Sequence, residues 1–163
     1  MNIRFAQKSD VKSILSFIQA LAEYEKLSHE VIASEPLLCD SLFSDNPDAE
    51  VIILEVEDSD ETEPKAVGFA LFFHNYSTFL AQKGIYLEDL FVLPEYRGKG
   101  YGKALLTQLA RIAKERDCGR LEWSVLDWNT PAIEFYQSLG AEFMNGWTVN
   151  RLTGKTLNNL AND

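Results

Sequence analysis

The sequence has few of the residues that form metal sites and disulfide frameworks. Its 163 residues include two cysteines and two histidines. Cys39 and Cys118 stand far apart, so they form no disulfide framework and indicate a reducing compartment, which we expect to be the cytoplasm. His29 and His74 have no metal-ligand spacing to each other or to a cysteine. This pattern argues against a metal site and against a Ser-His-Asp triad.

Long apolar runs and basic residues are also scarce. No stretch approaches the ~18 apolar residues of a membrane span, and the start, MNIRFAQKSD, lacks the apolar core of a signal peptide, so we expect no membrane association. The 15 basic residues are outnumbered by 25 acidic ones, which makes nucleic acid a poor partner. An acidic field attracts small cations, although acidity that serves only solubility remains an equally open explanation.

What the chain does contain is enough apolar sequence for one compact domain over residues 1–163, since 46% of it is hydrophobic. Strands are expected at 2–5, 50–56, 66–73, 85–92 and 121–126, with a closing pair from Phe143 through Leu152. Helices are expected after a Ser9 cap, from near Ser34, from Gly100 to about Arg116, and over 130–139. The charged stretch DSDETEP (58–64) is expected to be a solvated turn. Hairpins beside crossovers predict an α/β (α+β) fold with a mixed sheet.

One bend combines three cations with three glycines, directly after an apolar strand. Its sequence, RGKGYGK, interleaves Arg97, Lys99 and Lys103 with glycines at 98, 100 and 102. The first turn of a helix has unpaired N–H donors and suits an anion, and glycines let a phosphate approach the backbone. The spacing fits neither the P-loop pattern nor the dinucleotide pattern G-x-G-x-x-G. The bend therefore predicts a phosphate or pyrophosphate site of the form R-x-x-G-x-G.

Here the sequence resembles a known family. RGKGYG after LEDLFV resembles the acetyl-CoA pyrophosphate loop of the GNAT superfamily of N-acetyltransferases. LDWNTPAIEFYQSLGA (126–141) is similar to that family's N-x-x-A-x-x-x-Y-x-x-x-G segment, with Asn129, Ala132, Tyr136 and Gly140 in place. LAEYEKLS (21–28), NYST (75–78) and YLEDLFVLPEYRG resemble the spermidine/spermine (diamine) N-acetyltransferase branch, closest to its second-type, thialysine-associated members. This resemblance covers roughly residues 3–152.

The resemblance implies a fold and a function. The fold is a single GNAT-like domain, with a central sheet splayed between its fourth and fifth strands and flanked by helices. The function is acetyl-CoA-dependent acetyl transfer to a primary amine of a small cationic acceptor, a diamine or polyamine or a thialysine- or lysine-like amino acid. It further implies direct transfer in a ternary complex, no metal, and a homodimer.

The amine must lose a proton before it can attack. A lysine-like ammonium has a pKa near ~10.4, so holding it neutral costs roughly 4 kcal/mol, and a carboxylate can bind it and relay the proton. Glu88 and Asp89 are adjacent on a strand, so we expect their side chains on opposite faces. The resemblance assigns the base to Glu88. For Asp89 we favour a structural hydrogen-bond acceptor beneath the sheet, with a catalytic role as the alternative. It places Tyr24 and Glu25 at the substrate amine, with a solvated helix end as the alternative.

The remaining roles combine the demands of the chemistry with the same resemblance. The N–H groups of Leu90, Phe91 and Val92 stabilise the oxyanion if the strand at 122–124 splays away. Tyr136 protonates the CoA thiolate, with a core aromatic as the alternative, and Asn129 reaches the pantetheine amides, with a helix N-cap as the alternative. The other cofactor contacts are Arg97, Gly98, Lys99, Gly100, Tyr101, Gly102 and Lys103. Further substrate contacts are Glu122, Trp123 and Ser124.

One departure from the branch concerns the acceptor. Where the polyamine-preferring members carry Asp-Pro-Trp, this chain has Ser77, Thr78 and Phe79. Loss of that carboxylate argues against spermine and towards a lysine-like or small diamine acceptor. Two other functions remain open: a GNAT-fold module that binds acyl-CoA without turnover, and a protein or peptide acetyltransferase.

Overall fold

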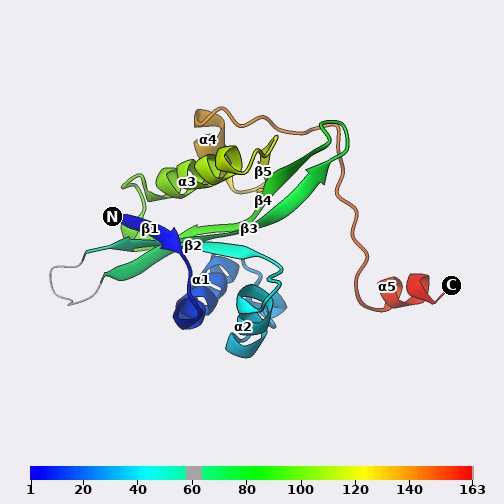
Figure 1. The fold of residues 1–163 in the computed structure, drawn as a ribbon, viewed down its shortest axis with the longest axis horizontal. Helices are drawn as coiled ribbons and strands as arrows, with labels where there is room; N and C mark the ends of the chain where they lie inside the picture. The colour runs from blue at the N-terminus through cyan, green and yellow to red at the C-terminus, as the bar shows by residue number, and fades with distance from the viewer. Residues whose placement is uncertain (58–63, 163) are drawn as a thin grey trace. The chain divides into compact units, whose positions relative to one another are not determined.

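A computed structural model describes residues 1–57 and 64–162, which form two compact units, Met1–Ser124 and Val125–Asp163 (Figure 1). Each unit is described by itself. The charged stretch expected to be a solvated turn falls, except for Pro64, outside the described residues. Among the described residues, no helix is long and apolar enough to cross a membrane.

The N-terminal unit (residues 1–124) is built on a five-stranded sheet in the order β1-β2-β3-β4-β5. Its strands are β1 Asn2–Phe5, β2 Glu50–Val56, β3 Lys65–Ser77, β4 Gln82–Val92 and β5 Leu121–Trp123. The first four pair antiparallel, and β5 lies parallel to β4. The predicted α/β class and mixed sheet are confirmed.

The predicted splay between the fourth and fifth strands is confirmed as well. β4 and β5 pair at only three positions, from Ile85 with Leu121 to Leu87 with Trp123. β4 continues to Val92, and within the described chain its last five residues have no partner in β5. This part of β4 therefore has one open edge.

Helices cover both faces of the sheet. α1 (Val11–Tyr24) and α2 (Glu35–Phe43) lie on one face, and α3 (Tyr101–Glu115) lies on the other (Figure 1). The apolar residues of α1 recur at helical spacing, so Ile14 and Phe17 meet the sheet, where the Phe17 ring stacks on Phe69 at 5.4 Å between centroids. Leu105 and Leu109 of α3 are fully buried on the opposite face.

Some predicted boundaries were wrong. Ser9 does not cap α1, because a short 3-10 turn (Lys8–Asp10) precedes the helix and puts Asp10 at the N-cap. β3 and β4 are longer than predicted, since their pairing extends to Ser77 with Gln82. β5 ends at Trp123 rather than at residue 126, and Trp123 is the last residue of β5 that pairs with β4.

The C-terminal unit (residues 125–163) contains α4 (Thr130–Ser138), as predicted, and α5 (Gly154–Ala161), which was not predicted. The closing pair of strands expected from Phe143 through Leu152 is wrong, because the structure gives these residues no strand. The physical reason is that an extended segment becomes a strand only when another strand satisfies its backbone groups. Here the segment is exposed from residue 142 onward, with Trp147 75% accessible.

Candidate active site

The glycine turn between β4 and α3 is open towards solvent. Gly98 and Gly100 adopt left-handed backbone angles, with φ of 74° and 82°, which favour glycine. Gly100 is the N-cap of α3 and supplies no side-chain cap, so the first N–H donors of the helix are left for another partner. A Cβ built on either glycine would meet nothing within 4 Å. The turn therefore offers donors and room to an anion, as the sequence predicts.

The three cations of the turn differ in what they contact. Lys103 is exposed in the first turn of α3, and the Lys99 ammonium lies 4.9 Å from the centroid of the Tyr96 ring. Arg97 instead donates from Nε to the carbonyl oxygen of Val92 at 2.9 Å and stacks on two aromatic rings. Lys99 and Lys103 thus supply the positive charge, together with the free edge of Arg97.

A β-bulge lies in β4 where the catalytic carboxylate was predicted. Leu71 of β3 pairs with Asp89 and the next residue, Phe72, pairs with Leu87, so Glu88 is an additional residue in β4. Bulges interrupt the alternation of side chains and often re-aim them near active sites. The expectation that Glu88 and Asp89 face opposite sides rested on unbroken alternation, which the register shift removes.

Asp89 is the carboxyl group most changed by this environment. Burial, together with the smaller effects of the negative charges of Glu88 and Glu25, raises the pKa of Asp89 to about 6. Glu25 lies just after α1, as its C-cap residue, and burial also raises the pKa of its carboxyl group. The structure therefore brings Glu25, Glu88 and Asp89 close enough for their charges to interact. The surface of this region is suited to a cation.

Tyr24, the last residue of α1, also meets the glycine turn. The guanidinium carbon of Arg97 lies 4.9 Å from the Tyr24 ring centroid. The end of α1, predicted to hold the substrate amine, therefore lies beside both the carboxylates of β4 and the predicted cofactor turn.

The open edge of β4 carries candidate donors for an oxyanion. Leu93 donates its backbone N–H to Val67 of β3 at 2.9 Å. Because donors alternate along an antiparallel strand, the N–H groups of Leu90 and Val92 point away from β3, and that of Phe91 points towards it. Two of the three predicted donors thus face the side that β5 leaves open.

The predicted substrate residues in β5 and directly after it have partners within the N-terminal unit. Glu122 accepts a hydrogen bond from the side-chain amide of Asn75 at 2.7 Å and forms an ion pair with Arg120 at 2.8 Å. The Ser124 hydroxyl is hydrogen-bonded to the Tyr86 hydroxyl at 2.8 Å. Trp123 is half-buried. These contacts join β5 to the long β3–β4 hairpin.

In the C-terminal unit, the second predicted motif is organised around α4. The Asn129 side chain accepts a hydrogen bond from Ala132 N–H at 3.4 Å, so the N-cap alternative for Asn129 is confirmed. Gly140 has a φ of 87°, and the N–H of Ala141 donates to the backbone carbonyl oxygen of Tyr136. This is the hydrogen bonding of a Schellman cap. The Tyr136 ring lies 5.3 Å from Phe135. The first and last residues of the motif therefore define the two ends of the helix that carries Tyr136.

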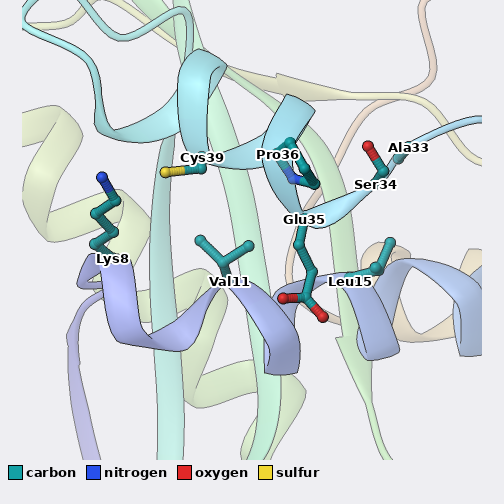
Figure 2. Close-up of a pocket in the computed structure, with 8 residues that line it drawn as sticks. All are labelled: Lys8, Val11, Leu15, Ala33, Ser34, Glu35, Pro36 and Cys39. Atoms are coloured by element: carbon teal, nitrogen blue, oxygen red, sulfur yellow. The ribbon is translucent and has the colours of Figure 1, made fainter.

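A surface cavity of about 640 Å³ lies elsewhere, between the beginnings of α1 and α2 (Figure 2). Its lining contains none of the predicted site residues and consists of Lys8, Val11, Leu15, Ala33, Ser34, Glu35, Pro36 and Cys39. Figure 2 shows Cys39 on α2 and Lys8 just before α1. This cavity is separate from the candidate active site.

Sequence reasoning underrated one carboxylate and missed a contact. For Asp89 a structural acceptor was favoured over a catalytic role, and nothing in its position along the sequence reveals the bulge. The stacking of Arg97 on Tyr24 joins residues 73 positions apart in the chain, and only the tertiary fold brings them together.

Sequence comparison defines the class of protein to which this arrangement belongs. Residues 15–141 match the Acetyltransferase (GNAT) family, so the chain is a member of the GNAT acetyltransferases. The match spans the glycine turn, the bulged strand and α4.

Individual relatives include acetyltransferases named for thialysine and for ornithine. The chain is 38% identical to thialysine N-epsilon-acetyltransferase of Bos taurus, over 98% of this chain and 96% of the relative. It is 35% identical to L-ornithine N5-acetyltransferase NATA1 of Arabidopsis thaliana, over 95% of this chain and 85% of the relative. Among solved structures, integron cassette protein VCH_CASS6 from the mobile metagenome of V. cholerae matches with a TM-score of 0.77 and 30% identity, over 99% of this chain and 98% of that chain.

Proposed function

We propose that this GNAT acetyltransferase transfers the acetyl group of acetyl-CoA to a side-chain primary amine of a small cationic acceptor, of the thialysine, ornithine or small-diamine class. The observation that carries the proposal is the grouping of Glu25, Glu88 and Asp89 beside the glycine turn, with Tyr24 in contact with Arg97. A cationic amine is attracted to the carboxylates, and an anionic coenzyme to the turn.

The glycine turn is the proposed coenzyme site. Its open space at Gly98 and Gly100 and the free donors of α3 fit a diphosphate, and Lys99 and Lys103 add positive charge. The coenzyme would supply an activated thioester. Tyr101 and Gly102 would contribute backbone donors, and Asn129 is proposed to contact the pantetheine in addition to capping α4.

The proposed chemistry is direct transfer in a ternary complex. Glu88, exposed on the bulge, receives the proton of the ammonium through water, and the neutral amine attacks the thioester carbonyl. The N–H groups of Leu90 and Val92 on the open edge of β4 stabilise the oxyanion. The tetrahedral intermediate then loses the second amine proton to solvent and expels the CoA thiolate. Tyr136 protonates this thiolate and regains its own proton from solvent. Glu122, Trp123 and Ser124 are proposed to line the acceptor side.

The most direct test is a panel of amines read by the release of CoA thiol. The panel contains thialysine, ornithine, lysine, putrescine, spermidine and spermine, with a lysine-containing peptide beside them. We expect the amino acids or the small diamine to show the highest kcat/KM, and spermine a lower value, since Ser77, Thr78 and Phe79 supply no carboxylate for a distant ammonium. Coenzyme binding without turnover of any amine would contradict the proposal and indicate a non-catalytic module. A peptide that outperformed every free amine would indicate a protein acetyltransferase.

We further propose that the enzyme is a homodimer. The support is the C-terminal segment, residues 142–162, which is exposed throughout and carries large apolar side chains. A second copy of the chain would give these side chains a surface to cover.

A further inference from the structure

Arg97 makes contacts that a residue dedicated to phosphate binding does not need. Its Nε donates to the Val92 carbonyl oxygen at 2.9 Å, and its guanidinium carbon lies 4.9 Å from the Tyr24 ring and 5.3 Å from the Phe91 ring. These distances are typical of cation–π contacts. Arg97 therefore joins the end of α1 to the last residues of β4.

Each partner of Arg97 belongs to a different part of the candidate site. Tyr24 precedes Glu25, whose charge acts on Asp89. Phe91 is 4% exposed and lies against Phe17, at 6.3 Å between ring centroids, so its position is fixed by the core. Val92 belongs to the open edge of β4. Gly98, the first glycine of the coenzyme turn, follows Arg97 directly.

The end of α1 closes with an irregular backbone. The helix closes with three backbone hydrogen bonds, from the N–H groups of Glu25, Lys26 and Leu27 to the carbonyl oxygens of Leu21, Glu23 and Ala22. Lys26 has a φ of 62°, in the left-handed region that a non-glycine residue adopts at a cost. Any contact that holds Tyr24 therefore affects whether this end keeps its geometry.

We propose that Arg97 is a positioning residue that couples the glycine turn to the end of α1, so that binding of the coenzyme orders Tyr24 and Glu25 for the amine. The inference rests on the proposed function, because it concerns the same site. A ligand that fixes the backbone at Gly98 also fixes the residue before it, and Arg97 transmits this to Tyr24. By thermodynamic linkage the amine must then tighten coenzyme binding by the same factor, about threefold to tenfold for a contact of this kind.

The first test needs no amine. Amide hydrogen exchange is followed in the peptide containing Glu25, Lys26 and Leu27, with and without saturating CoA. In the wild-type protein we expect CoA to slow exchange there severalfold. Arg97→Gln and Tyr24→Leu are expected to abolish this protection, whereas Tyr24→Phe, which keeps the ring, retains it. Lys103→Gln removes a different cation of the turn and, at saturating CoA, keeps the protection.

The second test measures the coupling itself. Calorimetry gives the Kd of CoA with and without the best amine of the panel. It also gives the Kd of that amine with and without CoA. In the wild-type protein, the amine should lower the Kd of CoA by the same factor by which CoA lowers the Kd of the amine. In Arg97→Gln, both factors should be near one.

Two results would overturn the inference. One is CoA protection of the α1 end that survives in Arg97→Gln. The other is a tenfold or larger loss of CoA affinity in Arg97→Gln with the coupling factor unchanged, which would assign the side chain to the phosphate alone. Failure of the proposed function looks different, because no amine would then release CoA while the exchange measurement would still report on Arg97.

Discussion

The raised pKa of Asp89 should make the stability of the folded protein depend on pH. Its pKa in the folded protein is about 6, against an ordinary value of 3.8, because burial and neighbouring carboxylates disfavour its ionised form. The folded chain therefore holds this proton more tightly than the unfolded chain. As a result, the contribution of Asp89 to stability falls as pH rises from about 4 to about 6 and is constant above that range.

We expect Asp89→Asn to raise the free energy of unfolding at pH 7.5 by as much as about 3 kcal/mol, since the amide cannot ionise. The difference from the wild-type protein should shrink towards zero near pH 4. Urea unfolding at a series of pH values measures it. Asp40→Asn, at an exposed position of α2, is the control and should show little pH-dependent difference. A difference for Asp89→Asn that is the same at every pH would contradict the pKa assignment.

Tyr136→Phe tests the proposed acid. The substitution keeps the ring that contacts Phe135 and removes only the hydroxyl. We expect turnover of the best amine to fall roughly a hundredfold or more, with the Kd of CoA changed by less than about twofold, because the role proposed for the hydroxyl is to protonate the leaving thiolate. Steady-state kinetics with calorimetry of CoA binding separates the two effects. Unchanged turnover would remove Tyr136 from the mechanism.

At the residue scale, the sequence named residues that the structure brings together, but it did not predict their surroundings. Tyr24, Glu25 and Glu88 were named from a motif, and the structure places Tyr24 against Arg97 and the charges of Glu25 and Glu88 against Asp89. The raised pKa of Asp89 could not be predicted, because it depends on a bulge set by the register of β3 against β4. Register is a property of two strands, and neither sequence segment contains it alone.

Among the secondary-structure elements, the glycine turn offers a test of the coenzyme site. Gly98→Ala and Gly100→Ala each place a methyl group where the structure has open space, so neither creates a clash within the protein. Their left-handed backbone costs each variant about 1 kcal/mol of stability. If a diphosphate occupies that space, we expect the Kd of CoA to rise by an order of magnitude or more, as measured by calorimetry.

Gly154→Ala is the matched control for this experiment. Gly154 also has a left-handed φ, of 54°, and also has nothing within 4 Å of an added Cβ, but it lies at the start of α5. It should lose a similar amount of stability and keep the wild-type affinity for CoA. Equal effects of all three substitutions on CoA affinity would mean that backbone strain, rather than contact with the coenzyme, is responsible.

Element prediction succeeded where local pattern and tertiary packing agree. The apolar spacing of α1 and α3 matches the faces they bury, so both helices lie where expected apart from their caps. The lengths of β3 and β4 were underestimated, because their outer halves alternate less clearly and are held by pairing with each other. The strand pattern after Phe143 has no partner strand in the structure, and α5 was overlooked because its sequence is mostly polar.

On the scale of the whole molecule, charge and composition indicated attraction of small cations, with solubility as an equally open explanation, and they gave no geometry. A formal net charge of −10 is consistent with attraction of a small cation. The fold separates the charges into two regions. It gathers Glu25, Glu88 and Asp89 at one place, while the glycine turn carries the local cations. Such an arrangement depends on contacts between distant segments and cannot be deduced from totals.

The C-terminal unit leads to a prediction about assembly. Seven large apolar side chains are at least 43% exposed between residues 142 and 162, namely Phe143, Met144, Trp147, Val149, Leu152, Leu157 and Leu160. Between 147 and 150, apolar and polar residues alternate as in a strand. The sheet of the N-terminal unit ends in β5, which is three residues long. A segment with a strand pattern and a sheet with an open edge are complementary, and two copies of the chain could satisfy both.

We therefore expect the protein to elute with about twice its monomer mass of 18.5 kDa in size-exclusion chromatography with light scattering. Replacing both Trp147 and Val149 by serine should shift it to the monomer, because these side chains then no longer favour burial against a second copy. Phe79→Ser is the control, since Phe79 is 94% exposed at the tip of the β3–β4 hairpin and lies outside the C-terminal segment. A dimer that persists in the double variant but dissociates in Phe79→Ser would place the interface on the hairpin. A wild-type monomer at micromolar concentration would mean that the apolar C-terminal residues have another partner.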